Sequence, residues 1–386
     1  MLKKITDTII YVGANDHDVD LFEGQYVVPN GMAYNSYVIL DEKITVMDTI
    51  DQTKTGEWLK NIADALGGRK PDYLVVQHME PDHSAGILQF AKAFPDAVIV
   101  SSAKAFPMMK NFFGEDFADR RLTVGDGDKL SLGKHTLQFI SAPMVHWPEV
   151  IVTFDECDGI LFSADGFGKF GTPDTDEPWD DEARRYYIGI VAKFGASVGG
   201  LLKKVSALPI RMICPLHGPV LCDDLAHYLA LYSTWSTYTP ETDGIVIAYA
   251  SVYGNTKAAC ELLGKELREK GKTVVLYDLT RCDISAAVAD AFRYSHLVLA
   301  SVTYNGDVFP PMKDFLDHLA GRAYQKRTVS YIENGSWAPT AAKVMRELLS
   351  GCKNLTETEH GVKLLSGVSE DAKAQILALA DELTGK

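Results

Sequence analysis

The sequence predicts an α/β protein built from two domains, and three observations support this. In the first half, several short apolar runs end in histidine or carboxylate side chains. The segment 239–244 is polar and rich in turn-forming residues, which is typical of a linker. After it, apolar runs of strand length alternate with amphipathic helical segments, as in a doubly wound parallel sheet. Because 386 residues exceed one ordinary domain, we expect domains at 1–240 and 244–386.

The composition disfavours several classes of protein. Hydrophobic residues make up 46% of the chain and charged residues 23%, as in a soluble globular protein. No uncharged apolar stretch approaches the ~18 residues of a membrane-spanning helix, and Asp7 interrupts what would be a signal peptide. A net charge of −14 disfavours nucleic acid as a partner. The six cysteines form no Cys-x-x-Cys pair, so we expect reduced thiols in a cytoplasmic protein without an iron–sulfur ligand set.

The first domain carries a hexapeptide that is dense in potential metal ligands. His-Met-Glu-Pro-Asp-His, at 78–83, directly follows a short apolar run that predicts a buried parallel strand. Ligands gather at the carboxyl ends of such strands. His78 and Glu80, two residues apart, can share one face of an extended chain, whereas a proline turn can direct Asp82 and His83 to a second position. This spacing indicates two metal ions rather than one.

Three further apolar runs in the first domain repeat the order of strand, ligand and turn. A single histidine after a strand is more often structural than a ligand, but recurrence at four strand ends favours a metal site. The additional candidate ligands are His146, Asp165 and His217.

Glu80 indicates which metal is bound. Dizinc hydrolases of the metallo-β-lactamase fold carry His-x-His-x-Asp-His at this place, a nitrogen-rich set suited to zinc. Here Glu80 replaces the second histidine, which leaves four imidazoles and three carboxylates for two ions. Additional anionic oxygen donors favour a harder cation and stabilise higher oxidation states. We therefore expect a diiron site, with Asp165 as the carboxylate that bridges the ions.

Hydrophobic periodicity predicts the remaining secondary structure. In the first domain, a helix is expected after the acidic stretch 174–182. Further helices are expected at 228–238, 255–270 and 371–383. The strands of the second domain are expected at 245–250, 273–279, 296–302 and 328–332, with a fifth between 355 and 364.

Three loops at strand ends of the second domain favour binding of FMN. The first, 251–256, brings hydroxyls, a glycine and an asparagine to a helix start, where backbone N–H groups and the helix dipole bind an anion. It resembles the phosphate loop of flavodoxins. Tyr304 and Trp337, in the other two loops, are placed to contact the isoalloxazine ring. The candidate FMN-binding residues are Ser251, Val252, Tyr253, Gly254, Asn255, Thr256, Ser301, Val302, Thr303, Tyr304, Asn305, Gly306, Asn334, Gly335, Ser336 and Trp337.

Some conspicuous residues are left outside both sites. The segment 166–171 matches the Gly-x-Gly-x-x-Gly pattern of dinucleotide-binding loops. Two prolines and three acidic residues within 172–178, however, disfavour a helix start and repel a pyrophosphate. Trp147 neighbours a candidate ligand and either lines the pocket, contacts a flavin or packs in the core. Tyr187 lies in a helix-like run and is interpreted as an aromatic residue on a helix face, so neither is placed in the metal set.

The ordered ligands, followed by a flavodoxin-like domain, resemble the flavodiiron proteins (A-type flavoproteins) of the class without a fused rubredoxin. The resemblance covers nearly the whole chain. It implies an N-terminal metallo-β-lactamase-like αββα domain and a C-terminal flavodoxin-like doubly wound parallel sheet. The implied ligands are His78, Glu80 and His146 for one iron, Asp82, His83 and His217 for the other, and Asp165 between them.

By the same resemblance, the expected activity is reduction of O2 to water, or of NO to N2O, at the diiron centre. No catalytic residue beyond the metal ligands is implied. Electrons would pass through FMN from an external donor, rubredoxin or a reduced deazaflavin. A head-to-tail homodimer, or a dimer of such dimers, would place the flavin of one subunit beside the iron of the other.

Two alternative functions remain open. One is a dimetal hydrolase of the metallo-β-lactamase fold with an appended flavodoxin domain. The other is an electron carrier whose metal domain is vestigial. Glu80 disfavours the hydrolase, and the complete ligand set disfavours the vestigial domain.

Overall fold

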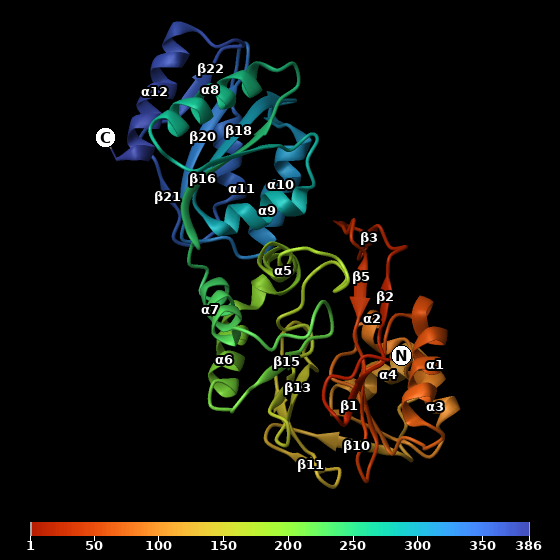
Figure 1. The fold of residues 1–386 in the computed structure, drawn as a ribbon. Coiled ribbons are helices and arrows are strands. Elements are labelled where there is room, and N and C mark those ends of the chain that lie inside the picture. The colour runs from red at the N-terminus through yellow and green to blue at the C-terminus, as the bar shows by residue number, and fades with distance from the viewer. Residues whose placement is uncertain (1, 386) are drawn as a thin grey trace. The chain divides into compact units, whose positions relative to one another are not determined.

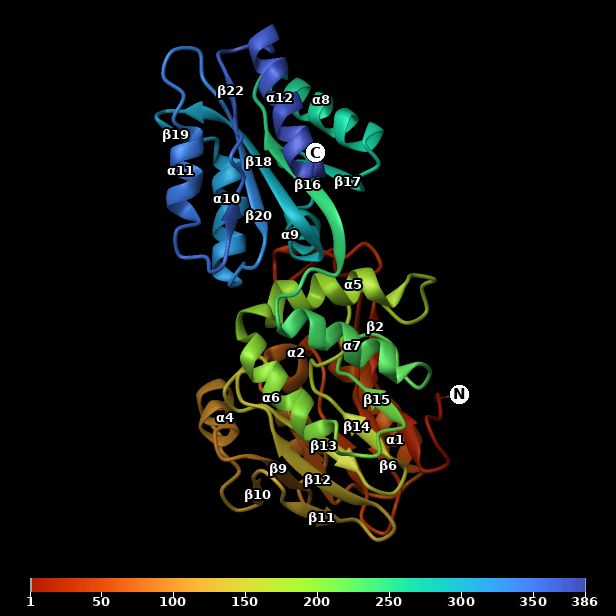
Figure 2. The ribbon, with the colours of Figure 1, turned by 90° about the vertical axis from the view of Figure 1, so that its left-hand side faces the viewer.

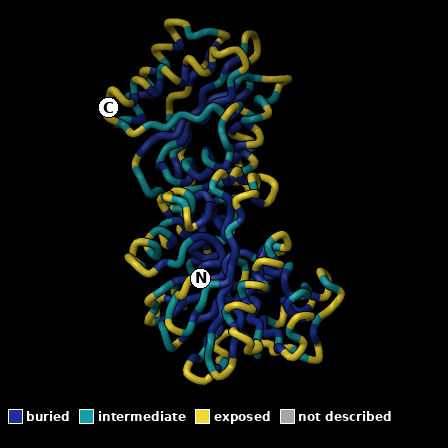
Figure 3. The backbone as a smooth tube through the Cα atoms, turned by 45° about the vertical axis from the view of Figure 1, so that its right-hand side comes forward, coloured by how far each residue is buried: buried dark blue, intermediate teal, exposed yellow. Residues whose placement is uncertain are grey.

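The computed structural model describes residues 2–385, which form two compact units. The first contains the residues up to Tyr187 together with Phe194–Ser236, and the second contains Ile188–Lys193 and the residues from Thr237 onward. Each unit has its own sheets and its own buried core (Figures 1 and 3). No helix in the described part of the chain is long and apolar enough to cross a membrane.

The first unit is a sandwich of two β-sheets with helices on the outside (Figure 2). Its six-stranded sheet has the order β1-β6-β7-β8-β9-β10, and its five-stranded sheet has the order β11-β12-β13-β14-β15. Val75 and Val100 of the first sheet pack with Phe139 and Phe162 of the second in one buried core. Trp58 of α1 and Phe90 of α3 are in ring contact, with centroids 6.1 Å apart.

The first unit has many short strands. Two of its helices, η1 and α2, are single turns. Its strands are β1 (Ile9–Tyr11), β2 (Ala14–Asp16), β3 (Leu21–Phe22), β4 (Tyr26–Val27), β5 (Met32–Tyr34), β6 (Tyr37–Ile39), β7 (Thr45–Met47), β8 (Tyr73–Val75), β9 (Val98–Ser102), β10 (Arg121–Val124), β11 (Lys129–Ser131), β12 (Thr136–Ser141), β13 (Ile151–Asp155), β14 (Ile160–Phe162) and β15 (Met212–Cys214). Its helices are η1 (Gln52–Lys54), α1 (Thr55–Leu66), α2 (Pro81–Ser84), α3 (Ile87–Ala93), α4 (Ala105–Phe113), α5 (Trp179–Tyr186), α6 (Gly195–Val205) and α7 (Leu225–Ser236). Two short helical segments, η2 (Tyr187–Val191) and η3 (Ala192–Phe194), follow α5.

The second unit is a parallel sheet covered by helices on both faces (Figure 2). The strand order is β17-β16-β18-β20, continued by the short strands β21 and β22, which both pair with β20. Leu263 of α8 and Leu379 of α12 pack with Ile247 and Val298 of the sheet, so these two helices cover the same face. The strands are β16 (Thr242–Ala250), β17 (Val274–Asp278), β18 (Tyr294–Tyr304), β19 (Asp307–Val308), β20 (Thr328–Asn334), β21 (Thr356–Glu357) and β22 (Val362–Leu364). The helices are α8 (Asn255–Glu269), α9 (Ile284–Arg293), α10 (Pro310–Gly321), α11 (Ala341–Leu348) and α12 (Glu370–Thr384).

Several boundaries differ from the sequence prediction by one to three residues, among them those of α7 (Leu225–Ser236, expected at 228–238), and three differences have a clear physical cause. Helix α5 starts inside the acidic stretch rather than after it, because its three carboxylates occupy the first turn, where the helix dipole stabilises them. Strand β16 starts at Thr242, within the expected linker, and its pairing with β18 shifts register between Thr242 and Ile245. The fifth strand is divided into β21 and β22. Between them, the backbone N–H groups of Glu359 and His360 donate to the carboxylate of Glu382 instead of to a neighbouring strand.

Candidate metal centre and flavin pocket

The seven candidate metal ligands lie in four loops at strand ends, and the structure brings them together. The first loop follows β8 and continues into α2, whose opening residue, Pro81, needs no hydrogen-bond partner for its nitrogen. This turn separates the two pairs of ligands in the hexapeptide, as the spacing predicted. The other loops follow β12, β14 and β15. In chain order the residues are His78, Glu80, Asp82, His83, His146, Asp165 and His217.

One group of ligands consists of His78, Glu80 and His146. A single Glu80 oxygen, Oε2, lies 2.9 Å from Nε2 of His146 and 3.3 Å from Nε2 of His78. Burial lowers the pKa of His146, but hydrogen bonds to Asp165 and Glu80 outweigh burial and raise that pKa to about 9. The imidazoles therefore hold protons against the carboxylates when no metal is bound, and a cation binds here by displacing those protons.

The second group consists of Asp82, His83 and His217. The Nε2 atoms of the two histidines are 3.0 Å apart, and they lie 3.3 and 3.2 Å from Oδ2 of Asp82. Both carboxylate oxygens of Asp82 are buried and have no hydrogen-bond donor in the described structure. A buried carboxylate is costly unless a cation balances it, so this group fits a metal ion.

Asp165 lies between the two groups. Its Oδ2 is 3.1 Å from Nε2 of His78 and 3.3 Å from Nε2 of His146. Its Oδ1 is 3.3 Å from Nε2 of His83 and 3.8 Å from Nε2 of His217. Burial raises the pKa of Asp165, but the surrounding imidazoles outweigh burial and hold it well below its usual value. One anionic oxygen therefore faces each group, as in a carboxylate that bridges two ions.

Residues outside the motifs hold the imidazoles in place. Nδ1 of His78 lies 2.8 Å from Oε1 of Glu149, which also accepts a hydrogen bond from the backbone N–H of Met79 at 2.9 Å. Nδ1 of His217 lies 2.8 Å from the backbone oxygen of Ala33. No motif in the sequence predicted these partners. The one available signal was the carboxylate of Glu149, three residues after a candidate ligand.

Aromatic side chains enclose the centre. Trp147 packs edge-on against His78, with ring centroids 5.3 Å apart. Phe22 and Tyr186 lie 5.5 and 5.4 Å from the ring of His217. Tyr187 is turned to the helices instead, and packs against Tyr232 and Trp235. Of the two aromatic residues left open by the sequence, Trp147 therefore contacts a candidate ligand and Tyr187 belongs to the core.

The glycine-rich loop 166–171 folds against the ligands and opens no nucleotide-binding helix. A Cβ atom on Gly168 would lie 3.1 Å from the backbone oxygen of Asp165 and 3.4 Å from Cβ of His217. The next helix begins only at Trp179. Close approach of the loop to the metal ligands therefore accounts for the glycine at 168.

A third cluster of ligand-type residues, around His135, is already satisfied. Nδ1 of His135 lies 3.0 Å from Oδ1 of Asp155, and Nε2 lies 2.9 Å from the hydroxyl of Thr8. Both ring nitrogens are engaged, so this cluster is a structural hydrogen-bond network.

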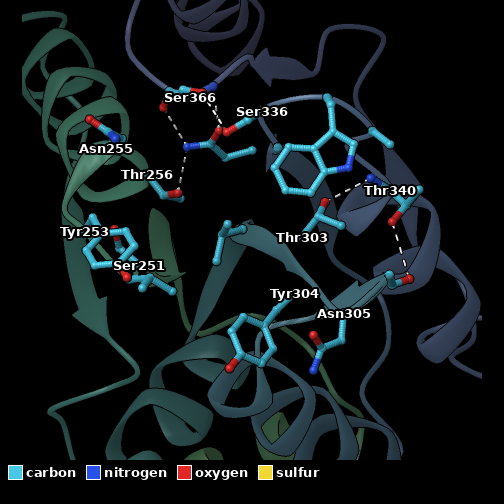
Figure 4. A pocket seen from close by; sticks show the side chains of 17 residues that line it. Ser251, Tyr253, Asn255, Thr256, Thr303, Tyr304, Asn305, Ser336, Thr340 and Ser366 are labelled. Atoms are coloured by element: carbon cyan, nitrogen blue, oxygen red, sulfur yellow. Dashed lines mark hydrogen bonds between the residues drawn. The ribbon is translucent and has the colours of Figure 1, made fainter.

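The second unit contains a pocket of about 570 Å³ at the carboxyl ends of its strands (Figure 4). Helix α8 begins there at Asn255, after Gly254 in the left-handed conformation (φ 91°), and the N–H of Gly254 donates to Oγ of Ser251. Tyr253 and Trp337 are 93% and 91% exposed at the pocket. Large exposed aromatic rings beside a cavity are typical of a site that binds a flat ring.

Most of the predicted FMN-binding residues line this pocket. Gly254 and Ser301 do not; Ser301 is fully buried and accepts a hydrogen bond from the N–H of Phe309. Three lining residues were missed because they lie outside the loop motifs: Ala338, Thr340 and Ser366. The predicted residues that line it are Ser251, Val252, Tyr253, Asn255, Thr256, Val302, Thr303, Tyr304, Asn305, Gly306, Asn334, Gly335, Ser336 and Trp337.

Comparison with known proteins agrees with this fold. The profile of the ODP family of β-lactamases matches residues 32–218, and the flavodoxin-domain profile matches residues 246–361. A nitric oxide reductase of Moorella thermoacetica is 29% identical, over 90% of this chain and 90% of its own length. A rubredoxin-oxygen oxidoreductase of Megalodesulfovibrio gigas is 28% identical, over 90% of this chain and 89% of its own. The crystal structure of the flavodiiron protein from Giardia intestinalis has a TM-score of 0.93 and 27% identity, and covers 100% of this chain and 96% of that one.

Fold, candidate ligands and pocket together define a class of protein in which a dimetal domain of the metallo-β-lactamase type precedes a flavodoxin-like domain. The chain belongs to the flavodiiron protein family. The predicted fold class is thereby confirmed.

Proposed function

We propose that this chain is a flavodiiron oxidoreductase that reduces O2 to water, NO to N2O, or both, with electrons that pass through FMN. The observation that carries the proposal is the position of Asp165, with one carboxylate oxygen toward each of two ligand groups. The names of the relatives, a nitric oxide reductase and a rubredoxin-oxygen oxidoreductase, support both substrates.

In this proposal, residues 1–240 form the diiron domain and residues 244–386 the FMN domain. The seven clustered side chains hold two irons in the groups described above, with Asp165 as the bridge. The sixteen residues predicted from the three loops form the FMN site. For Gly254 and Ser301 the proposed role is indirect, since neither lines the pocket. Gly254 supplies the turn into α8, and Ser301 supports the next loop.

Irons bound here would supply Lewis-acid binding of the diatomic gas and two electrons, and reduced FMN would supply two more. The protein's own side chains orient the centre. Glu149 and the backbone oxygen of Ala33 fix the rings of His78 and His217, so that both Nε2 atoms face the metals. Trp147, Phe22 and Tyr186 line the imidazoles with apolar surface and limit the access of bulk water.

The flavin pocket provides neutral contacts only. The N-terminus of α8 and the hydroxyls of Ser251 and Thr256 face the pocket, as a phosphate site requires. No lysine or arginine lines the described pocket. Tyr304 and Trp337 supply exposed rings for the isoalloxazine. FMN, with its single phosphate, matches this site.

The electron donor and the assembly complete the proposal. We infer an external donor, rubredoxin or a reduced deazaflavin; the first is supported by the name of the relative from Megalodesulfovibrio gigas. We also infer a head-to-tail homodimer, or a dimer of such dimers, in the cytoplasm. The six free cysteines support a reducing compartment.

Metal and flavin analysis of the purified protein tests the proposal against the hydrolase alternative. Two irons and one FMN per chain are expected, together with consumption of O2 or NO when the protein is reduced. Two zinc ions and turnover of a thioester or ester would contradict it. Sedimentation would test the assembly separately, since a stable and fully active monomer excludes the head-to-tail dimer.

A further inference from the structure

The four candidate imidazole ligands differ in what holds the ring nitrogen that faces away from the metals. Nδ1 of His78 meets the carboxylate of Glu149 at 2.8 Å, whereas Nδ1 of His217 meets the neutral backbone oxygen of Ala33. Nδ1 of His83 is buried and has no hydrogen-bond partner within residues 2–385. For His146, the polar contacts within that range are made by Nε2, to Glu80 and Asp165. Of the four, His78 is therefore the one whose outer nitrogen is bonded to a carboxylate.

The setting of Glu149 concentrates its charge on His78. The residue is 2% exposed, and its Oε1 accepts from both His78 and the backbone N–H of Met79. Its Oε2 is buried without a partner, and within the described chain its one ion pair is with His78. The hydroxyl of Ser102 donates to the backbone oxygen of Glu149 at 2.7 Å and fixes the main chain there.

The hydrogen bond between His78 and Glu149 changes how strongly His78 donates its electron pair to a metal. Nε2 faces Glu80 and Asp165 and must be free of a proton to bind a cation, so Nδ1 carries the proton and donates it toward Glu149. A carboxylate at that position raises the basicity of the imidazole. A more basic ligand stabilises the ferric over the ferrous ion and so lowers the reduction potential.

The metal ligands alone do not make the reduction potentials of the two irons differ. Each group offers two imidazoles, one terminal carboxylate and one oxygen of Asp165. The asymmetry between the two groups therefore lies in the partners of the imidazoles, and the charged partner lies on one side.

We propose that Glu149 is a positioning residue that makes the two irons inequivalent, by lowering the reduction potential of the iron held by His78, Glu80 and His146. The inference rests on the proposed function, because it requires iron at both positions. As the diferric centre takes up two electrons, the first goes to the iron on the Asp82 side and the second to the iron on the His78 side. On oxidation, the His78 iron gives up its electron first.

Glu149→Gln tests this, because the amide oxygen can accept both hydrogen bonds of Oε1 while the negative charge is lost. The readout is a stepwise reductive titration with dithionite, in which EPR measures the half-reduced, mixed-valence centre. We expect the second reduction step to move to higher potential while the first stays nearly in place. The equilibrium constant that favours the half-reduced state should fall about tenfold, which corresponds to 59 mV for a one-electron step.

Asp155→Asn is the matched control. Asp155 forms a fully buried pair with His135 in the same domain, at 3.0 Å, without touching a candidate ligand. This variant should lose stability and keep both potentials. With two irons bound in Glu149→Gln, an unchanged or wider separation of the steps would overturn the inference, as would an equal shift in Asp155→Asn. A wild-type protein that binds no iron would instead overturn the proposed function itself.

Discussion

At the scale of single residues, the metal site could be predicted because its ligands are marked by their neighbours in the sequence. His78, Glu80, Asp82 and His83 are adjacent in the chain, and the other three each follow an apolar run and precede a turn. Glu149 carries no such mark. It acts on His78 across 71 positions of sequence, so its role appears only when the fold brings the two side chains together.

The choice of metal is proposed to depend on Glu80, and Glu80→His tests this. The substitution replaces an anionic oxygen donor with an imidazole, which favours zinc over iron. When metal-free protein is offered Fe2+ and Zn2+ together without oxygen, the bound zinc-to-iron ratio should rise by about tenfold relative to wild type. Elemental analysis after desalting measures the ratio.

The control for this experiment is Glu156→His, the same exchange at an exposed carboxylate that pairs with Lys129. It should bind metals in the wild-type ratio. If Glu80→His binds zinc and iron in the wild-type ratio as well, the donor at position 80 does not select the metal.

At the scale of elements, each strand that hydrophobic periodicity predicted in the second domain is present, but several begin or end at other residues than predicted. The start of α5 depended on carboxylates in its first turn, and the split between β21 and β22 depended on Glu382, a residue of the last helix. The sequence correctly predicted that the glycine-rich loop 166–171 does not open a nucleotide-binding helix. Two prolines and three acidic residues separate this loop from the next helix.

The stability of the fold around His135, which lies in the turn between β11 and β12, should depend on pH. Burial lowers the pKa of His135, but Asp155, with smaller contributions from Asp158 and Asp41, outweighs burial and raises it above its ordinary value. A histidine whose pKa is higher in the folded state stabilises the fold fully below its unfolded pKa of ~6.5, and this contribution is lost as the pH rises through the folded pKa. The stability advantage of wild type over His135→Asn should therefore shrink between about pH 6 and pH 8. Urea unfolding of both proteins at several pH values measures this difference in unfolding free energy. A difference that stays constant across the pH range would contradict the prediction.

The flavin pocket depends on Asn334 at the end of β20. Its amide nitrogen donates to Oγ1 of Thr256 at 3.3 Å and to the backbone oxygen of Ser366 at 2.9 Å, and its Oδ1 accepts from the N–H of Ser366 at 3.1 Å. Asn334→Ala removes these links between two pocket loops, at about 1 kcal/mol each, and should weaken FMN binding by about tenfold or more. Flavin fluorescence quenching measures the dissociation constant. Ser350→Ala, on the surface after α11, is the control and should bind FMN as wild type does. Equal affinity in Asn334→Ala would show that the pocket loops hold their shape without this side chain.

At the scale of the whole molecule, the change from metal-ligand loops to alternating strands and helices indicated two domains, but residue patterns did not show what holds the segment just before 244. Lys326 donates to the backbone oxygen of Thr237 at 2.8 Å, and Arg327 donates to that of Tyr238 at 2.7 Å. These contacts join the segment before 244 to the second unit. Side-chain bonds to backbone oxygens leave no periodic signal in a sequence.

A pair of fragments tests how much the segment 237–243 adds to the stability of the second domain. A fragment of residues 237–386 keeps both contacts and the first residues of β16, whereas one of residues 244–386 loses them. Each lost hydrogen bond is worth about 1 kcal/mol, so the shorter fragment should unfold at a lower urea concentration. Identical midpoints would show that the two contacts add nothing to the stability of that domain.

In the proposed reaction, electrons pass from the flavin to a diatomic gas at the metal centre. The most direct test is anaerobic stopped-flow mixing of the fully reduced protein, loaded with iron and FMN, with O2 and with NO in turn. We predict that the flavin absorbance recovers with at least one gas much faster than in protein carrying FMN alone. Recovery no faster than in that iron-free protein, with either gas, would contradict it.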